Sequence, residues 1–349
     1  MKAMVLDKTG PIEHNRLRLA DLPRPAPDEN EILVKVSCCG VCHTDLDEIE
    51  GRLPPTRFPI VLGHQVVGTV ADKGSSAARF GIEQRVGITW LHSSCGKCSF
   101  CQSGCENLCD DAKWTGKDAD GGYAEYMVVR EAFAHPIPEP FSDAQATPLL
   151  CAGVIGYRAV RLSQISNGQI VGLFGFGASA HIVIQIIRHK FPDSPVFVFT
   201  RSKEHRQLAR TLGAAWAGSP ADEPPARVHR AIDFTPAGES IRTALLAMEK
   251  GGRLVINAIR KTTPTPPLDY SECLWLEKEI KSVANVTRED AAEFLPLAAK
   301  IPIIPEVRQF SLDQANEALL LLKQAKIRAA AILNIGNLQN EVGNLEYSR

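Results

Sequence analysis

The sequence has almost no net charge, because 39 lysines and arginines are matched by 40 aspartates and glutamates over 349 residues. Binding to nucleic acid or to an anionic membrane relies on excess positive charge, so the composition favours neither partner. Long hydrophobic runs are missing as well. The start of the chain, Met1 to Asp7, lacks the apolar core of a signal peptide, and no stretch approaches the length of a transmembrane helix. We therefore expect a cytoplasmic protein.

The remaining composition, with 44% hydrophobic and 23% charged residues, is ordinary for a globular protein, and the length suffices for two domains. Residues 1–150 are predicted to be mostly β, with apolar segments broken by glycine and proline. From about residue 155, strands and helices alternate, which predicts a doubly wound parallel sheet. The expected strands are 31–37, 66–71, 169–174, 196–200, 230–234, 253–257 and 329–333, and the expected helices are 178–189, 204–212, 241–248 and 312–324.

A glycine turn follows the expected strand 169–174. It reads Gly175-Phe-Gly177-Ala178-Ser-Ala180 and leads directly into an apolar helix. This G-x-G-x-x-A pattern, with a strand before it and a helix and second strand after it, is typical of dinucleotide binding. The glycines allow the backbone to approach a pyrophosphate at the helix N-terminus. Without that context, a plain tight turn would explain the glycines equally well.

The end of the second strand bears on which nicotinamide cofactor is used. NAD-specific sites place an acidic residue there for the ribose 2′-hydroxyl, but this chain has Thr200, followed by Arg201, Ser202 and Lys203. The arginine offers a planar fork of donors for a 2′-phosphate, and the two hydroxyls add further donors. The pattern favours NADP(H) over NAD(H). The alternative is that Arg201 and Lys203 are solvated residues heading the next helix and that NAD binds.

Ten cysteines call for an explanation, and four of them share one short loop. The spacing Cys95-x-x-Cys98-x-x-Cys101-x7-Cys109 suits a closed, tetrahedral, structural zinc site. Cys105 competes as the fourth ligand. Cys109 is preferred because it leaves a longer return loop.

A second set of metal-binding residue types is dispersed along the chain. Cys42 stands in the run Cys42-His43-Thr44-Asp45, His64 follows a glycine, and Cys151 precedes the expected parallel sheet. Two thiolates and one imidazole would leave a fourth position open, which is the pattern of catalytic zinc. Taken singly, His64 would more often be a structural histidine and Cys151 a small core residue.

The ordered set of motifs resembles the zinc-dependent medium-chain alcohol dehydrogenases over nearly the whole chain. The run Gly63-His64-Gln65-Val-Val-Gly68 is closest to the bacterial propanol-preferring members. The resemblance implies an α/β plus β architecture, in which a GroES-like catalytic domain accompanies a Rossmann domain with a doubly wound parallel sheet. The implied domains are 1–152 (catalytic, first part), 153–284 (Rossmann) and 285–349 (a segment completing the catalytic domain).

The resemblance also implies roles for individual residues. Thr44 would relay the alcohol proton, Asp45 would orient His64 through its other ring nitrogen, and His43 would approach the cofactor phosphates. Trp90 would join Thr44 in the substrate pocket, unless it is an ordinary core tryptophan. Arg328 would contact the pyrophosphate, although without the resemblance it would be taken as a surface charge. The implied cofactor contacts are His43, Gly175, Gly177, Ala178, Thr200, Arg201, Ser202, Ala258, Asn285 and Arg328.

Two positions depart from the family pattern. The zinc-binding histidine is usually followed by glutamate, but this chain has the neutral amide Gln65. Some members end their proton relay on a histidine four residues after the position of His43, where this chain has Asp47. The relay could end instead on a cofactor ribose hydroxyl and His43, or on water.

The expected function is hydride transfer between a small or medium primary alcohol, or its aldehyde, and NAD(P), with two zinc ions per chain. A homodimer or homotetramer is implied. One alternative is an NADP-dependent reductase of bulkier aromatic or unsaturated aldehydes. A non-enzymatic alternative, a zinc-stabilised nucleotide-binding protein, is disfavoured because a purely structural fold needs neither Thr44 nor Asp45. A polyol dehydrogenase is disfavoured because that branch often has a carboxylate where Cys151 stands.

Overall fold

The computed structural model describes residues 1–301, 303, 305–327 and 330–336. These residues form two compact units. The first comprises Met1–Ser94, Asp111–Leu150 and the described residues from Glu306 onwards, and the second comprises Cys95–Asp110 and Cys151–Pro305. No helix in the described part of the chain is long and apolar enough to cross a membrane.

The second unit is built on a six-stranded sheet in which every neighbouring pair of strands is parallel. Its order, β13-β12-β11-β14-β15-β16, reverses direction between β11 and β14. This is the doubly wound arrangement that binds ligands at the carboxyl ends of its strands. The strands are β11 (Val171–Phe174), β12 (Val196–Phe199), β13 (Trp216–Gly218), β14 (Val228–Asp233), β15 (Met248–Ile256) and β16 (Glu279–Ser282).

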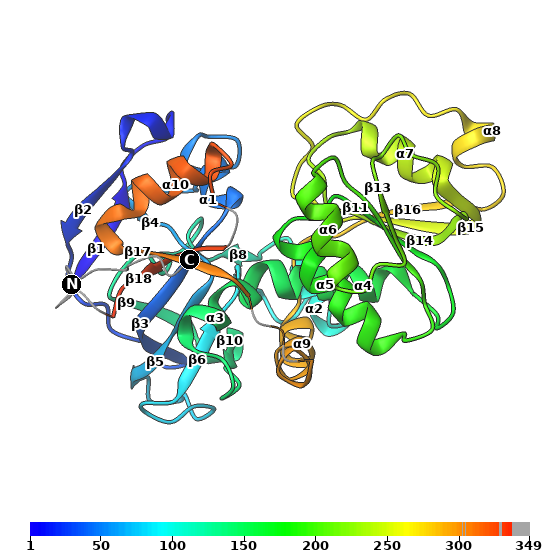
Figure 1. Ribbon diagram of the computed structural model, residues 1–349. Helices are drawn as coiled ribbons and strands as arrows, with labels where there is room; N and C mark the ends of the chain where they lie inside the picture. Colours follow the sequence, from blue (N-terminus) through cyan, green and yellow to red (C-terminus); the bar gives the residue numbers. More distant parts are fainter. Residues whose placement is uncertain (302, 304, 328–329, 337–349) are drawn as a thin grey trace. The chain divides into compact units, whose positions relative to one another are not determined.

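Helices connect these strands and cover the sheet (Figure 1). Right-handed crossovers place α5 and α6 on one face and α7 on the other. The helix α4 packs against α5 and α9, and α7 packs against β14 and β15. The helices are α2 (Ser99–Gln102), α4 (Val154–Ser163), α5 (Ala178–Lys190), α6 (Lys203–Thr211), α7 (Glu239–Ala247), α8 (Tyr270–Cys273) and α9 (Arg288–Lys300).

The core of this sheet is aromatic where the strands end. The rings of Phe174 and Phe199 are stacked with centroids 4.2 Å apart, and Trp216 meets Phe199 edge-on. Both phenylalanines are the last residues of their strands, and each is about 2% exposed. The turn that follows each strand is therefore held on a rigid, buried base.

The first unit is mostly β, as expected from its alternating sequence. Its central strand, β3, pairs with β5, β9 and β18 in a seven-stranded sheet. Three-stranded (β2-β1-β4) and two-stranded (β7-β8) sheets complete it. The strands are β1 (Lys2–Leu6), β2 (Leu17–Asp21), β3 (Glu31–Val41), β4 (Ile60–Val61), β5 (Val66–Lys73), β6 (Arg85–Ile88), β7 (Leu91–Ser93), β8 (Lys113–Trp114), β9 (Tyr126–Arg130), β10 (Ala134–Pro136), β17 (Val307–Ser311) and β18 (Ala330–Asn334).

The described part of this unit contains the α-helices α1 (His43–Ile49), α3 (Asp143–Pro148) and α10 (Ala315–Lys323). The expected helix 312–324 begins with a 3-10 turn, Leu312–Gln314, before α10 starts. The helix α10 packs against α1 and β18, and its buried residues Ala315, Ala318 and Leu319 join the apolar core of the unit.

The compact units differ from the expected domain ranges in two places. The four-cysteine loop, 95–110, packs with the parallel-sheet unit, although it lies within the range 1–152 expected for the first part of the catalytic domain. Residues 285–301, which include α9, also belong to the unit of the parallel sheet, although they lie within the range expected to complete the catalytic domain. Polar contacts between the cysteine loop and α9 account for the first difference, and the packing of α9 against α4 accounts for the second.

Candidate functional site

The N-terminus of α1 presents several predicted residues in a fixed arrangement. Cys42 is the N-cap, and its Sγ accepts a hydrogen bond from the backbone N–H of Thr44 at 3.3 Å. In return, Oδ2 of Asp45 accepts from the backbone N–H of Cys42 at 2.7 Å. This reciprocal capping box satisfies N–H groups that a helix start would otherwise leave unpaired. It also fixes the positions of Cys42, Thr44 and Asp45 relative to one another.

His64 lies between β4 and β5 and is 1% exposed. Its Nδ1 is 3.2 Å from Oδ1 of Asp45, a contact that does not meet hydrogen-bond geometry, and Nε2 is buried, also without a hydrogen-bond partner among the described residues. Burial alone would lower the pKa of His64, but Asp45 and Cys42 outweigh that effect and raise the pKa well above its usual value. The surroundings of the ring therefore favour positive charge. A carboxylate on one ring nitrogen and an unpartnered second nitrogen are the arrangement of a metal-binding histidine.

Cys151 completes the group. The peptide bond before it marks the boundary between the two compact units, and it lies within a π-helical turn, Leu149–Gly153. Ligand atoms of Cys42, His64 and Cys151 all lie within 4.8 Å of one another. Two thiolates and one imidazole are soft and borderline donors that suit zinc, and three such ligands leave a coordination position open. The side chains present thus fit a catalytic zinc.

Other side chains near this group were predicted from the sequence. The Thr44 hydroxyl has no hydrogen-bond partner among the residues described, and Thr44 is 8% exposed. The carboxylate of Asp47 accepts from Arg52 Nε, so this residue at the relay position is engaged in an ion pair. Gln65 is buried next to the backbone of Gly40.

One buried acid beside this group was not predicted from the sequence. Glu48, in α1, is fully buried, and neither of its carboxylate oxygens has a hydrogen-bond partner in the described structure. Burial is the main reason that the pKa of Glu48 is raised well above its usual value, and Asp45 raises it further.

The tryptophan Trp90, between β6 and β7, packs on two rings of the same unit. Its centroid is 5.9 Å from that of His64 and 5.1 Å from that of Trp114. The indole Nε1 is buried and lacks a hydrogen-bond partner among the described residues. A large ring therefore stands directly beside the histidine of the metal-binding group.

The second group contains Cys95, Cys98, Cys101 and Cys109, whose thiols also lie within 4.8 Å of one another. The structure thus gathers Cys109, and not Cys105, with the other three. Backbone N–H groups of Lys97 and Cys98 lower the pKa of Cys95 to about 6. Four thiolates within such a loop fit a closed, structural zinc site.

Polar contacts fasten this loop to α9. The Glu106 carboxylate, 3% exposed, accepts from the backbone N–H of Arg288 at 3.0 Å and from its Nε at 2.9 Å. The Asn107 amide donates to the carbonyl of Ala284. At the other end of the network, Asp290 is fully buried and accepts from Arg158 at 2.7 Å. These partners lie more than 100 residues apart in sequence, which explains why pattern reasoning missed them.

The predicted cofactor residues of the second unit lie beyond the carboxyl ends of its parallel strands. Gly175 follows β11 with φ +85°, and a Cβ there would come within 2.8 Å of Thr235, so only glycine fits. Nothing lies within 4 Å of the corresponding position on Gly177. Ala178 then begins α5, whose N-terminus has no side-chain cap. Exposed N–H groups at such an end suit a phosphate.

The segment after β12 is also well defined. Thr200 is buried, and Arg206 holds the carbonyls of Thr200 and Arg201 at 2.8 and 3.1 Å. Ser202 is the N-cap of α6, and its hydroxyl donates to Glu204 at 2.7 Å. The Arg201 side chain is exposed and has no hydrogen-bond or ion-pair partner within the described parts of the chain.

The remaining cofactor predictions are placed as follows. Ala258 is the second residue after β15, and Asn285 follows β16 with φ +60° and a buried amide nitrogen that has no partner among the described residues. Sequence reasoning missed Asn257, whose amide donates to Ser179 in the first turn of α5 at 3.5 Å. His43 is exposed and belongs to the first unit. Arg328 lies outside the described residues.

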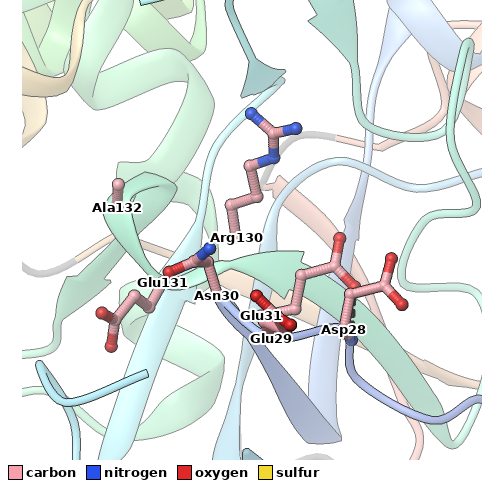
Figure 2. A pocket seen from close by; sticks show the side chains of 7 residues that line it. All are labelled: Asp28, Glu29, Asn30, Glu31, Arg130, Glu131 and Ala132. Atoms are coloured by element: carbon pink, nitrogen blue, oxygen red, sulfur yellow. Dashed lines mark hydrogen bonds between the residues drawn. The ribbon is translucent and has the colours of Figure 1, made fainter. Parts of the chain in front are cut away.

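A separate depression of about 630 Å³ lies in the first unit, where the segment before β3 meets the end of β9 (Figure 2). None of its lining residues belongs to either metal-binding group. Its carboxylates are partly engaged, since Glu31 accepts from the backbone of Asp28 and Glu131 from that of Arg79. The lining residues are Asp28, Glu29, Asn30, Glu31, Arg130, Glu131 and Ala132.

Comparisons with known proteins agree with this architecture. Residues 28–139 match the family described as the alcohol dehydrogenase GroES-like domain. A probable alcohol dehydrogenase of Mycobacterium tuberculosis is 44% identical over 332 residues, covering 94% of each chain. An alcohol dehydrogenase of Geobacillus stearothermophilus is 31% identical, covering 96% of this chain and 99% of its own. The solved structure of an NAD-dependent alcohol dehydrogenase, 24% identical, superposes with a TM-score of 0.87 over 96% of this chain and 100% of its own.

A GroES-like β unit, a doubly wound nucleotide-binding sheet and a Cys–His–Cys group together define a two-domain dehydrogenase with a metal centre. The chain belongs to the zinc-dependent medium-chain alcohol dehydrogenase family.

Proposed function

We propose that this alcohol dehydrogenase binds two zinc ions per chain, a catalytic one at Cys42, His64 and Cys151 and a structural one at the four-cysteine loop. The reaction is the interconversion of an alcohol and its aldehyde with a nicotinamide cofactor. The observation that carries the catalytic assignment is His64, whose Nδ1 faces Asp45 at 3.2 Å and whose buried Nε2 lacks a partner among the described residues. Such an unpartnered buried nitrogen calls for a ligand.

When bound, zinc would supply Lewis-acid stabilisation of an alkoxide and the nicotinamide would accept the hydride. The chain's own residues place the substrate and move its proton. The Thr44 hydroxyl, which has no partner among the described side chains, is free to accept the alcohol proton. Asp45 holds His64 in one orientation, and the capping box holds Asp45. Because Arg52 engages Asp47, we propose that the proton continues through the cofactor ribose and His43, or through water.

We also propose that the enzyme prefers NADP(H). The exposed guanidinium of Arg201 has no hydrogen-bond or ion-pair partner in the described structure. Arg206 fixes the backbone that carries Arg201, so the fork is presented from a rigid loop. A charge-assisted contact between arginine and a 2′-phosphate is strong and directional. Ala258 and Asn285 would lie at the nicotinamide.

Small primary alcohols are the proposed substrates. The Trp90 ring, 5.9 Å from the His64 ring and supported by Trp114, takes up volume beside the proposed catalytic zinc. This favours short chains over bulky aromatic aldehydes.

The proposed assembly is a homodimer or homotetramer in the cytoplasm, formed through the edge of the parallel sheet. Among the strands that the structure describes, β16 pairs only with β15, and all four of its residues are exposed. Exposed apolar side chains lie in and before it: Tyr270, Trp275, Leu276 and Ile280. An unpaired edge flanked by apolar side chains is suited to pairing with a second copy.

The deciding experiment combines metal analysis with steady-state kinetics. Wild-type protein should contain two zinc ions per chain and oxidise ethanol and butanol more efficiently than benzyl alcohol. The Cys151→Ser variant should lose one zinc and its activity while remaining folded. Cys105→Ser, a substitution in the cysteine loop but outside the group of four, serves as the matched control and should keep both. A Cys151→Ser enzyme with two zinc ions and full turnover would refute the catalytic assignment.

A further inference from the structure

Glu48 is a buried acid without a structural explanation. It is 0% exposed, and neither carboxylate oxygen has a hydrogen-bond partner in the described structure. Burying a polar group without such a partner is costly, and acids are rarely left in this condition unless they have a further role. Glu50, two residues further on, shows the ordinary alternative, because its carboxylate pairs with Arg52 and Lys323.

The helix α1 places Glu48 on the side of the proposed catalytic metal. At about 100° per residue, Glu48 stands one turn beyond Thr44 and Asp45, with its direction between theirs. Thr44, Asp45 and Glu48 are all buried. Because Asp45 faces His64 and Cys42 caps the same helix, Glu48 shares the face of α1 that carries the residues of the metal-binding group.

The charged groups that act most strongly on Glu48 are Asp45 and residues of the metal-binding group, with Lys117 as the exception. They are Asp45 and Cys42, which are negative when ionised, and His64 and Lys117, which are positive when protonated. No arginine or lysine forms an ion pair with Glu48 among the residues described. The residue after His64, Gln65, is a neutral amide and adds no negative charge. A divalent cation held by Cys42 and His64 would supply the positive charge that Glu48 lacks.

We propose that Glu48 is a positioning residue of the catalytic metal centre, whose carboxylate helps to retain the divalent cation bound by Cys42, His64 and Cys151. This inference rests on the proposed function of that group. Glu48 would thus help to retain the metal without being one of its three ligands. The effect is electrostatic, so it depends on the charge of the side chain more than on its shape.

The test compares Glu48→Gln, which keeps the shape and removes the charge, with wild-type holoenzyme. Transfer of zinc to the chelator 4-(2-pyridylazo)resorcinol is followed by absorbance, and cobalt-substituted enzyme is followed by its visible spectrum. We expect Glu48→Gln to weaken retention of one zinc by about 10- to 100-fold, the range seen for residues that support metal ligands. The zinc of the four-cysteine loop is an internal control and should be retained as in wild type. Glu50→Gln, at the C-cap of the same helix, is the matched control and should change neither zinc.

A rescue variant separates charge from packing. In Glu48→Gln/Gln65→Glu, a carboxylate returns at the buried position next to His64, and we expect most of the lost retention to be restored. The inference would be overturned if Glu48→Gln transferred zinc to the chelator as slowly as wild type does and its cobalt spectrum were unchanged. It would also be overturned if the double variant retained zinc as weakly as Glu48→Gln does, because the loss would then come from packing and not from charge. Retention of both zinc ions by Cys151→Ser would instead refute the metal site itself.

Discussion

Replacing Glu106 by glutamine tests whether the four-cysteine loop is fastened to the parallel-sheet unit by one buried carboxylate. Glu106 begins the 3-10 turn Glu106–Leu108, and Arg288 is the first residue of α9. Oε1 of Glu106 accepts two hydrogen bonds from Arg288, one from its backbone and one from its side chain. Glutamine keeps an oxygen that can accept from the backbone N–H of Arg288. It removes the negative charge that strengthens the hydrogen bond from the Arg288 side chain.

The size of the effect follows from burial. A hydrogen bond to a charged group contributes about 1.5–3 kcal/mol to stability, and the neutral amide keeps part of it. The Arg288 side chain is 43% exposed, so solvent screens the lost ion pair. We therefore expect the free energy of unfolding to fall by about 1–2 kcal/mol. For a unit of this size, that corresponds to a lower Tm by roughly 2–8 °C.

Scanning calorimetry of wild type, Glu106→Gln and Glu289→Gln measures this difference. Glu289 pairs with Arg161 at 3.0 Å, but its side chain is 61% exposed, so the same change there should cost no more than about 0.5 kcal/mol. Equal melting temperatures for all three proteins would show that the Glu106–Arg288 contact does not hold the loop in place.

Three further outcomes are expected. Cys98→Ser should lose the structural zinc and lower the Tm by about 10 °C or more, because the binding free energy of a structural metal is folding free energy; an unchanged melting curve by calorimetry would count against the site. Arg201→Ala should reduce kcat/KM for NADP(H) by about 10- to 100-fold, the value of a lost charge-assisted contact, and leave NAD(H) nearly unaffected; steady-state kinetics in which wild type prefers NAD(H) and the variant changes neither cofactor would reject the NADP proposal. Ile280→Glu, on the exposed strand β16, should reduce the assembly to the 38.0 kDa chain in light scattering, and a wild-type protein that is already monomeric at micromolar concentration would remove the assembly proposal.

Local spacing was sufficient to predict much of this structure. The turn at Gly175 and Gly177 could be recognised because a strand, a tight turn and a helix follow one another within a few residues. The grouping of Cys95, Cys98, Cys101 and Cys109 could be predicted for the same reason, since the loop that joins them is short. The dispersed group of Cys42, His64 and Cys151 required the resemblance to a family, because spacing alone does not bring distant residues together.

Buried charges could not be predicted in this way. In a sequence, Glu106 and Asp290 resemble surface residues, since glutamate and aspartate are seldom buried without a partner. Their burial depends on Arg288 and Arg158, which are 182 and 132 residues away along the chain. The packing of the cysteine loop with α9 follows from these contacts, and for that reason the ranges expected for the domains differ from the compact units. Glu48 was missed for a different reason, because it has no partner at all in the described chain to suggest a role.

The geometry of the proposed catalytic group depends on the folding of a helix that is short by itself. The helix α1 has seven residues, and isolated helices shorter than about 12–15 residues are marginal in water. It is stabilised at its start by Asp45, which accepts from the backbone N–H of Cys42, and by Cys42, whose Sγ accepts from that of Thr44. The same two side chains supply the carboxylate facing His64 and a proposed ligand. A change that weakens the cap therefore also displaces the residues proposed to hold the metal. For the same reason, a metal bound by Cys42 and His64 would stabilise the first turn of α1, so that metal binding and the local fold are coupled through these side chains.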